Sequence, residues 1–419
     1  MLSLNFVREQ RDVVTAAIAA KRVGLNLDRL LGLDEEVRKA RGALDALRAE
    51  RKRVSDGFKD AAPEDRPALG ARAKAIGAEI SAGEAVLAGQ EAELRALMLQ
   101  LPAIPWKGAP VGPDEASNVV VRTEGSPRVF GFEPRDHVAL LEMNDWADLA
   151  RITKVSGART YCLKGRLALL ESALMLLAQR RLADEGFTLM TVPAIAREEA
   201  FTATGHFPVG REDAYAVPKD ELFLAGTGEI ALTSLHSGEI LDADVLPILY
   251  AGVSPCFRRE AGSAGRDVRG LLRVHQFLKV EQYVICEDDE AVSAMWHQRL
   301  LANAEGLLQA LEIPYQVVET STGDMGLGKF RMNDIESWVP SLGKYRETHS
   351  CSTLHDWQAR RADLRWRDGT GKVRFVHTLN NTALASPRIL VPLLENHQQA
   401  DGGVRLPAAM RPLMGSEYL

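Results

Sequence analysis

Cysteine is scarce in this sequence, and long apolar runs are missing from it. The four cysteines among 419 residues lie far apart and form no C-x-x-C pair, so neither a zinc site nor a disulfide framework is indicated. No run approaches the roughly 20 apolar residues that cross a bilayer. The amino-terminal stretch MLSLNFVREQRDVV carries charges where a signal peptide has its apolar segment. We therefore expect a cytoplasmic protein with no membrane partner.

Basic residues are outnumbered by acidic ones, and phosphate-binding fingerprints are also missing. The net charge of -6, from 51 basic and 57 acidic residues, argues against general nucleic-acid binding but not against a local basic patch. The stretch 261–270 contains neither GxxxxGK(S/T) nor GxGxxG, and MGLGKF at 325–330 is too short a match to count. The 46% share of hydrophobic residues predicts a globular chain, and the length of 419 residues predicts two or three domains.

Two long helices are predicted near the amino terminus. Apolar positions follow the alternating four-and-three spacing of a coiled coil over 33–54 and again over 69–94. The glycine and two prolines of 56–67 predict the turn between them. The two helices would form an antiparallel hairpin on the order of 40 Å long at 1.5 Å per residue.

Basic residues gather at the far end of this hairpin. Phosphate contacts there need neither a groove nor an enzyme pocket, so the tip is a candidate nucleic-acid-binding surface. Acidic residues are interleaved, which leaves a solvated face or a dimerisation coil as alternatives. The candidate contact residues are Arg48, Arg51, Lys52, Arg53, Arg72 and Lys74.

A connector rich in proline and glycine, LPAIPWKGAPVGPDEASN, separates the hairpin from the rest of the chain. We place the domain boundary near residue 108, which gives an amino-terminal domain of 1–108 and a second domain of 109–419. The second mixes strand-like runs, helical patterns and isolated glycines, so its expected class is α+β.

The most informative part of the second domain is a predicted strand over 272–288. Alternate residues share one side of a pleated strand. The resulting polar face holds Arg273, His275, Phe277, Lys279, Glu281 and Tyr283. Residues 246–260 predict the partner strand, with Arg258 and Glu260 on one face. A charged hairpin facing water is the alternative, but Phe277 argues against it because an aromatic ring there can stack on a base.

The hairpin CFRREAGSAGRDVRGLLRVHQFLKVEQ resembles motif 2 of class II aminoacyl-tRNA synthetases, in the form seen in bacterial seryl-tRNA synthetases. Three further segments agree in order: 226–241 is similar to the TxE segment, 343–361 to the metal and ATP segment, and 379–398 to motif 3. Pro193 matches the central proline of motif 1. The amino-terminal hairpin matches the arm with which this family binds the long variable arm of its tRNA.

This resemblance implies a class II catalytic domain, an antiparallel sheet flanked by helices, next to a coiled-coil arm. It implies activation of L-serine with ATP and transfer of serine to the 3′-terminal ribose of tRNA(Ser), with tRNA(Sec) as a further acceptor where one exists. Motif 1 builds the dimer interface in this family, so a homodimer is implied. Because the reaction positions two anions against each other, it calls for arginines and Mg²⁺ rather than a protein nucleophile.

The resemblance also implies roles on the ATP side. Arg258 matches the motif 2 arginine that bridges the α-phosphate and the serine carboxylate, and Arg388 matches the motif 3 arginine at the γ-phosphate. Arg273 matches a further phosphate-side arginine. Phe277 matches the ring under adenine, and Glu260 the acid near the adenine amino group.

Metal and serine positions follow from the same resemblance. Glu347 and Ser350 fall where the family holds its divalent ion, and oxygen ligands suit Mg²⁺. Hydrogen bonds to the serine hydroxyl in a closed pocket would reject analogues that lack it. Glu281 is a candidate partner for both the ammonium and the hydroxyl of serine. The implied serine contacts are Thr227, Glu229, Arg258, Glu281, Asn380 and Thr382.

Several positions depart from the family pattern. Residues 227–229 are Thr-Gly-Glu where Thr-Ala-Glu is usual, and Asn381-Thr382 replaces a common Gly-Ser, which predicts a larger side chain near the pocket. His349 stands where a small residue is frequent. Pro392 lies inside the predicted motif 3 helix, where it should delete a hydrogen bond and kink the axis.

Two other functions are considered. One is a paralogue that activates an amino acid for a carrier protein; such relatives tend to lack the arm, so the basic hairpin argues against it. The other is a noncatalytic RNA-binding protein on a synthetase fold. The presence of Arg258, Glu281, Glu347 and Arg388 argues against that hypothesis, because an inactive site has no need of matched phosphate and metal groups.

Overall fold

The structure, a computed structural model, describes residues 1–261 and 269–419. Its chain divides into two units. The helical unit consists of Leu2–Ala19 and Val23–Leu101, and the sheet unit of Met1, Ala20–Arg22 and Pro102–Leu419. Among the helices of the described ranges, none combines the length and apolar character that crossing a bilayer requires.

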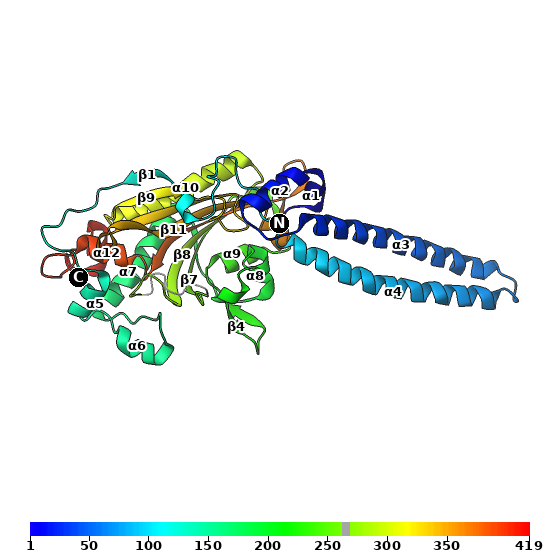
Figure 1. The fold of residues 1–419 in the computed structure, drawn as a ribbon, viewed down its shortest axis with the longest axis horizontal. Helices are drawn as coiled ribbons and strands as arrows, with labels where there is room; N and C mark the ends of the chain where they lie inside the picture. Colours follow the sequence, from blue (N-terminus) through cyan, green and yellow to red (C-terminus); the bar gives the residue numbers. More distant parts are fainter. Residues whose placement is uncertain (262–268) are drawn as a thin grey trace. The chain divides into compact units, whose positions relative to one another are not determined.

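The helical unit contains the long hairpin that the heptad pattern predicts. Its helices are α1 (Leu4–Glu9), α2 (Arg11–Ala20), α3 (Leu27–Asp60) and α4 (Arg66–Met98). Helices α3 and α4 run side by side (Figure 1). Leu44, Ile76 and Ile80 form the buried seam between them, because the apolar positions of each helix fall on the face toward the other.

The turn of this hairpin is shorter than the sequence predicts. Helix α3 continues through Gly57 to Asp60, and α4 already begins at Arg66. A glycine inside a helix costs only about 1 kcal/mol relative to alanine, which the seam tolerates. Pro67 stands in the first turn of α4, where its missing N–H has no intrahelical partner to lose. The prediction that the glycine and the second proline interrupt the helices was therefore wrong.

The sheet unit is built on one sheet of eight strands among the described residues. Its order is β1 (Val119–Glu124), β9 (Tyr315–Glu319), β10 (Arg331–Val339), β11 (Lys344–His355), β14 (His377–Ser386), β8 (Gln276–Cys286), β7 (Ile248–Phe257) and β2 (Thr188–Thr191). Neighbours pair antiparallel except β2 and β7, which are parallel. The predicted α+β class with an antiparallel sheet is confirmed.

Helices and two small sheets surround this large sheet. The helices are α5 (His137–Met143), α6 (Leu149–Ser156), α7 (Gly165–Asp184), α8 (Glu198–Thr204), α9 (Glu229–Ser234), α10 (Glu290–Ala310), α11 (Ala359–Ala362), α12 (Leu390–His397) and α13 (Arg411–Met414). One small sheet joins β3 (Ile195–Arg197), β5 (Leu222–Leu224) and β4 (Tyr215–Val217). The other joins β13 (Val373–Phe375), β12 (Arg365–Arg367) and β6 (Ile240–Asp242).

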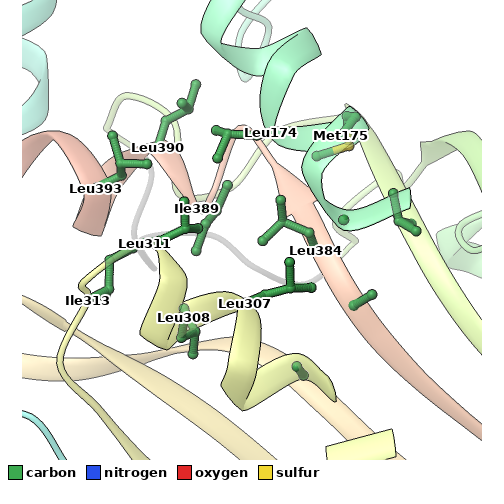
Figure 2. Packing of buried hydrophobic residues seen from close by; sticks show 14 of the residues in the cluster. Leu174, Met175, Leu307, Leu308, Leu311, Ile313, Leu384, Ile389, Leu390 and Leu393 are labelled. Atoms are coloured by element: carbon green, nitrogen blue, oxygen red, sulfur yellow. The ribbon is translucent and has the colours of Figure 1, made fainter. Parts of the chain in front are cut away.

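One face of the large sheet packs on the main hydrophobic core. Figure 2 shows Leu174 of α7, Leu307 of α10, Leu384 of β14 and Leu390 of α12 in this core. All four are fully buried, and each such burial contributes about 1.5–3 kcal/mol. Alternate residues of β8, such as Val280, point into the same core. The intervening polar residues of β8 therefore lie on the opposite face.

The predicted hairpin of strands is present, but both strands are shorter than expected. Strand β8 begins at Gln276 rather than at residue 272, and β7 ends at Phe257 rather than at residue 260. Next to the last ladder pair, the N–H of His275 donates to the carbonyl of Arg159 instead of to a strand. Arg258, Glu260 and Arg273 therefore lie beyond the ends of the strands. The predicted loop residues 262–268 fall outside the described part of the chain.

Pro392 does not have the effect predicted for it. Helix α12 begins at Leu390, so Pro392 stands in the first turn. An N–H at that position has no partner within the helix, and the ring deletes no helix hydrogen bond. The expected broken hydrogen bond is therefore absent from this described helix.

Candidate active site

A cavity on the polar face of the sheet collects most of the predicted site residues. Its volume is about 220 Å³, or about 940 Å³ when the open space at its mouth is included. Of the predicted residues, those that line it are Thr227, Glu229, Arg258, Glu260, Phe277, Glu281, Glu347, Ser350, Asn380, Thr382 and Arg388. Arg273 is not among the described residues that line the cavity. Its guanidinium pairs with the carboxylate of Glu260, which does line the cavity.

Strand pairing explains why residues distant in sequence meet here. In the ladder of β8 and β14, Glu281 lies directly opposite Thr382. In the ladder of β11 and β14, Asn380 lies opposite Ser352. Directly opposite residues in an antiparallel pair have Cβ atoms about 4.5–5.5 Å apart, so three strands present their side chains to one space.

One end of the cavity is a buried network around Glu281. Asn380 donates from Nδ2 to Glu281 Oε1 at 3.0 Å. The ammonium of Lys279 contacts the Glu281 carboxylate and donates to Thr227 Oγ1 at 2.7 Å. Glu281 is 1% exposed and Lys279 is 5% exposed. A buried charge needs a partner, and the Lys279 ammonium is the partner of the Glu281 carboxylate. This carboxylate can receive a cationic or hydroxyl-bearing ligand.

Glu229 forms a second buried carboxylate at the same end. Gln358 donates from Nε2 to Glu229 Oε1 at 2.6 Å, and Lys329 Nζ lies 3.8 Å from the same oxygen. Lys329 also donates to Asn380 Oδ1 at 3.3 Å. Burial disfavours the charged form of Glu229, but the charge of Lys329 and the bond from Gln358 outweigh it, so the pKa of Glu229 is lowered. Both carboxylates at this end are thus held by ammonium groups.

Arginines gather at the other end of the cavity. Arg258 lies over the Phe277 ring, 5.2 Å from its centroid, and donates to the carbonyl of Gly226 at 3.3 Å. Arg388 donates to the carbonyl of Leu272 at 3.2 Å. Burial, together with the charge of Arg258, lowers the pKa of Arg388, while Glu347 counteracts it. Two guanidinium groups that line one cavity favour a ligand with several negative charges.

Glu347 and Ser350, the predicted metal residues, lie on β11 and line the cavity. Opposite Ser350 in β10, Asp334 is 7% exposed, and its Oδ1 has no hydrogen-bond partner in the described part of the chain. Burial, followed by the charge of Glu347, raises the pKa of Asp334 well above its ordinary value. In the described ranges no three His, Cys, Asp or Glu side chains converge as a ready metal cage. Such a sparse set of oxygens fits Mg²⁺, which keeps waters and phosphate ligands.

The residues that depart from the family pattern differ in whether they line the cavity. His349 is buried in the cavity wall, and burial lowers its pKa to about 4, so its imidazole is neutral at pH 7. Thr382 lines the cavity, but Asn381 points the other way, since its side chain bonds Gln282 at 2.6 Å and the carbonyl of Ser350 at 2.9 Å. The larger side chain expected near the pocket is therefore Thr382 alone.

Sequence reasoning missed three cationic or titratable residues of the cavity. Lys279 is predicted on the polar face of β8 but without a role, although its alternation with Phe277 and Glu281 is a sufficient signal. Lys329 comes from the MGLGKF segment, which is no P-loop but does deliver its lysine to the cavity. His206 has no local signal, and burial lowers its pKa to about 4.

Comparisons with known proteins identify relatives along the whole chain. The profile of the tRNA synthetase class II core domain (G, H, P, S and T) matches residues 215–397. That of the seryl-tRNA synthetase N-terminal domain matches residues 1–105. The chain is 54% identical over 415 residues to the serine–tRNA ligase of Deinococcus radiodurans, covering 99% of this chain and 98% of that protein.

Further relatives extend the likeness. The serine–tRNA ligase of Thermobifida fusca is 44% identical over 100% of this chain and 99% of its own. The crystal structure of seryl-tRNA synthetase from Pyrococcus horikoshii, complexed with ATP, superposes with a TM-score of 0.92 at 38% identity, covering 100% of this chain and 99% of that one. The chain therefore belongs to the seryl-tRNA synthetase family of class II aminoacyl-tRNA synthetases, as its motifs predict.

Proposed function

We infer that this chain is a serine–tRNA ligase, which activates L-serine with ATP and then esterifies the 3′-terminal ribose of a serine tRNA. The observation that carries this inference is the cavity with two chemically distinct ends on one sheet face. Paired buried carboxylates at one end suit an amino acid, and arginines at the other suit a triphosphate. The full-length relatives support the same activity.

At the carboxylate end, Glu281 is the proposed partner of the serine ammonium and hydroxyl. Its Oε1 is already oriented by Asn380, which leaves little freedom for a ligand that does not match. Thr227 and Thr382 add hydroxyl groups to the same space, and Glu229 adds negative charge. Alanine has no hydroxyl group for these polar side chains to bond, which is a stronger source of discrimination than size alone.

At the arginine end, the proposed reaction needs only positioning and charge neutralisation. A serine carboxylate oxygen attacks the α-phosphorus, the bond to the bridging oxygen of the β-phosphate breaks, and pyrophosphate leaves with that electron pair. We assign Arg258 to the α-phosphate and the serine carboxylate and Arg388 to the γ-phosphate, because forked donors match these oxygens. Phe277 would stack under adenine, and Glu260, held by Arg273, would accept from the adenine amino group.

Mg²⁺ is proposed at Glu347 and Ser350, beside the phosphate end. The ion would supply positive charge to the phosphates when bound. Glu347 lies 3.7 Å from the Arg388 guanidinium, so the carboxylate that would hold the ion lies beside an arginine that would contact a phosphate.

The hairpin of the helical unit is the proposed tRNA-binding arm. Arg48 is paired with Glu84 at 2.8 Å, and Arg72 is paired with Glu50. The remaining predicted contacts, Arg51, Lys52, Arg53 and Lys74, are all exposed. Arg48, Arg51 and Lys52 line one groove between α3 and α4, a local basic patch that suits phosphates on an acidic protein. The same arm would admit tRNA(Sec) as a second acceptor.

A homodimer is proposed through the motif 1 region. The sheet unit exposes apolar side chains on α7, Leu169 and Leu176, and on the neighbouring strand β2, Leu189, which lies four residues before Pro193. Exposed apolar side chains gathered on neighbouring elements are typical of interfaces. We also propose a cytoplasmic location, which rests on the four free cysteines.

ATP–pyrophosphate exchange tests the activity. The purified protein is offered serine, threonine, alanine, glycine and cysteine separately, and tRNA charging is scored in parallel. Serine-dependent exchange with charging is expected. Exchange without charging would favour a ligase for another acceptor, and no exchange with any of the five would favour a noncatalytic RNA-binding protein.

A further inference from the structure

Lys21 is a buried lysine that is not among the described residues lining the substrate cavity, but it hydrogen-bonds one turn of the cavity wall. Lys21 follows the last residue of α2, belongs to the sheet unit and is 8% exposed. Its Nζ donates to the carbonyls of Gly326 and Leu327, each at 3.1 Å, and to the carbonyl of Lys329. An ammonium group has three donors, so this one turn satisfies all of them.

The turn 326–329 has little freedom to adjust. A Cβ at Gly328 would lie 2.5 Å from the Trp357 ring, so the backbone there is pressed against an indole. Within the turn, the N–H of Lys329 donates to the carbonyl of Gly326 at 3.1 Å. From outside it, the N–H of Ala103 donates to the carbonyl of Leu327 at 2.9 Å. The position of the turn therefore determines where the Lys329 side chain starts.

Lys329 is the residue that this turn delivers to the cavity. Its ammonium donates to Asn380 Oδ1 at 3.3 Å and lies 3.8 Å from Glu229 Oε1. Asn380 in turn donates to Glu281 at 3.0 Å. A chain of contacts thus runs from Lys21, through the backbone of the turn, to both carboxylates of the amino-acid end.

We propose that Lys21 is a positioning residue for amino-acid selection: by gathering three carbonyls of the turn 326–329, it places the Lys329 ammonium between Glu229 and Asn380. This role rests on the proposed assignment of that end of the cavity to serine. Burial, followed by the charge of Lys329, lowers the pKa of Lys21 to about 7. In its protonated form, charge-assisted hydrogen bonds fix the turn more firmly than neutral bonds would. Without them, Lys329 moves and the two carboxylates lose a shared counter-charge, while the arginine end keeps its own contacts.

Steady-state exchange kinetics of Lys21→Met test the proposal. Loss of a charge-assisted hydrogen-bond set of this kind should raise the KM for serine roughly tenfold. The KM for ATP should change less than about twofold, because the arginine end keeps its partners. Lys329→Met should have the same serine-selective effect, and the double variant should be no worse than Lys329→Met alone, because both substitutions act through one contact.

Arg22→Met is the matched control. Arg22 is the next residue, is exposed, and donates to the carbonyl of Pro113 at 3.2 Å rather than to the turn. Its KM for serine should equal that of the wild type. Should Lys21→Met fail to fold, Lys21→Gln is measured with the same criteria, because its amide keeps two N–H donors without the charge.

Three results would overturn the role of Lys21: equal changes in both KM values, effects of the two lysine substitutions that multiply in the double variant, or an unchanged KM for serine in Lys21→Met. Wild-type exchange is measured first. Its absence would refute the assigned activity, whereas normal wild-type exchange with an unaltered Lys21→Met enzyme would refute the positioning role alone.

Discussion

Asn380 of β14 donates a hydrogen bond from Nδ2 to Oε1 of Glu281 of β8, over 3.0 Å and across the two strands. Both side chains are buried, so neither can turn to water when the cavity is empty. The carboxylate that we assign to serine is therefore oriented before any ligand binds, which reduces the ordering cost of binding.

Glu281→Gln keeps the shape of this side chain and removes its charge. Hydrogen bonds to charged groups are worth about 1.5–3 kcal/mol, so kcat/KM for serine should fall roughly 10- to 150-fold in pyrophosphate exchange. The KM for ATP should stay nearly constant. Glu290→Gln, an exposed substitution at the start of α10, serves as the control. Wild-type serine kinetics in Glu281→Gln would refute the assignment of this residue.

Arg258→Ala should nearly abolish exchange. A preorganised donor at a developing charge contributes on the order of 100- to 1,000-fold in rate, and Arg258 is assigned to both reacting anions. The neighbouring Arg259 is exposed and donates to the carbonyl of Glu212 at 3.0 Å, so Arg259→Ala is a matched control that should retain most activity. If the two variants lose exchange equally, the site assignment is wrong.

The arm makes a separate prediction. Replacing Arg51, Lys52 and Arg53 together by alanine should leave exchange with serine unchanged and raise the KM for tRNA in charging. For each phosphate that the arm no longer neutralises, the slope of log affinity against log salt should fall by roughly 0.9 in duplex regions. Charging and salt dependence that match the wild type would contradict a role of these three residues in tRNA binding.

Oligomeric state tests the motif 1 surface. Sedimentation should report twice the 45.9 kDa chain mass at micromolar concentration. Leu176→Glu places a charge in the proposed apolar interface and should shift the mass toward that of one chain, since an unpaired charge there is costly to bury. Val155→Glu, at a residue that is 78% exposed in α6, is the control. A wild-type protein that sediments only as a single chain would contradict the dimer.

Buried histidines predict loss of stability in acid. Burial lowers the pKa of His297 to about 4, and its ring bonds Thr353 and Asn333. The unfolded chain binds this proton near the ordinary pKa of about 6.5, so it holds more protons than the folded chain between pH 6.5 and 4. Stability is therefore complete above that window and falls as pH drops through it, by about 2 kcal/mol at pH 5 for one such group.

His297→Gln removes this titration while keeping a side chain that can bond Thr353 or Asn333. Denaturant unfolding at pH 7.5 and pH 5 should show a smaller acid loss in the variant than in the wild type, whatever the stability of the variant at pH 7.5. His275→Gln is a useful comparison, because it replaces another histidine in the same sheet unit. An acid loss that His297→Gln leaves unchanged would rule out this contribution.

Much of the fold could be predicted because its signals are local. The heptad spacing of α3 and α4 and the alternation of β8 place side chains on faces with no knowledge of the rest of the chain. The family motifs then identify eleven residues that line one cavity. The errors lie at element ends: Gly57 and Pro392 predict interruptions, although helix context tolerates both.

From the sequence, the resemblance of its motifs predicted the family, and residue spacing predicted the α+β class, the long hairpin and the polar face of β8. Tertiary contacts were needed to learn that Lys329 and His206 reach the cavity, that Asn381 turns away from it, and that Lys21 holds the turn beneath Lys329. The physical reason is that loops and buried charges take their positions from partners hundreds of residues away, and no local period in the sequence records such contacts.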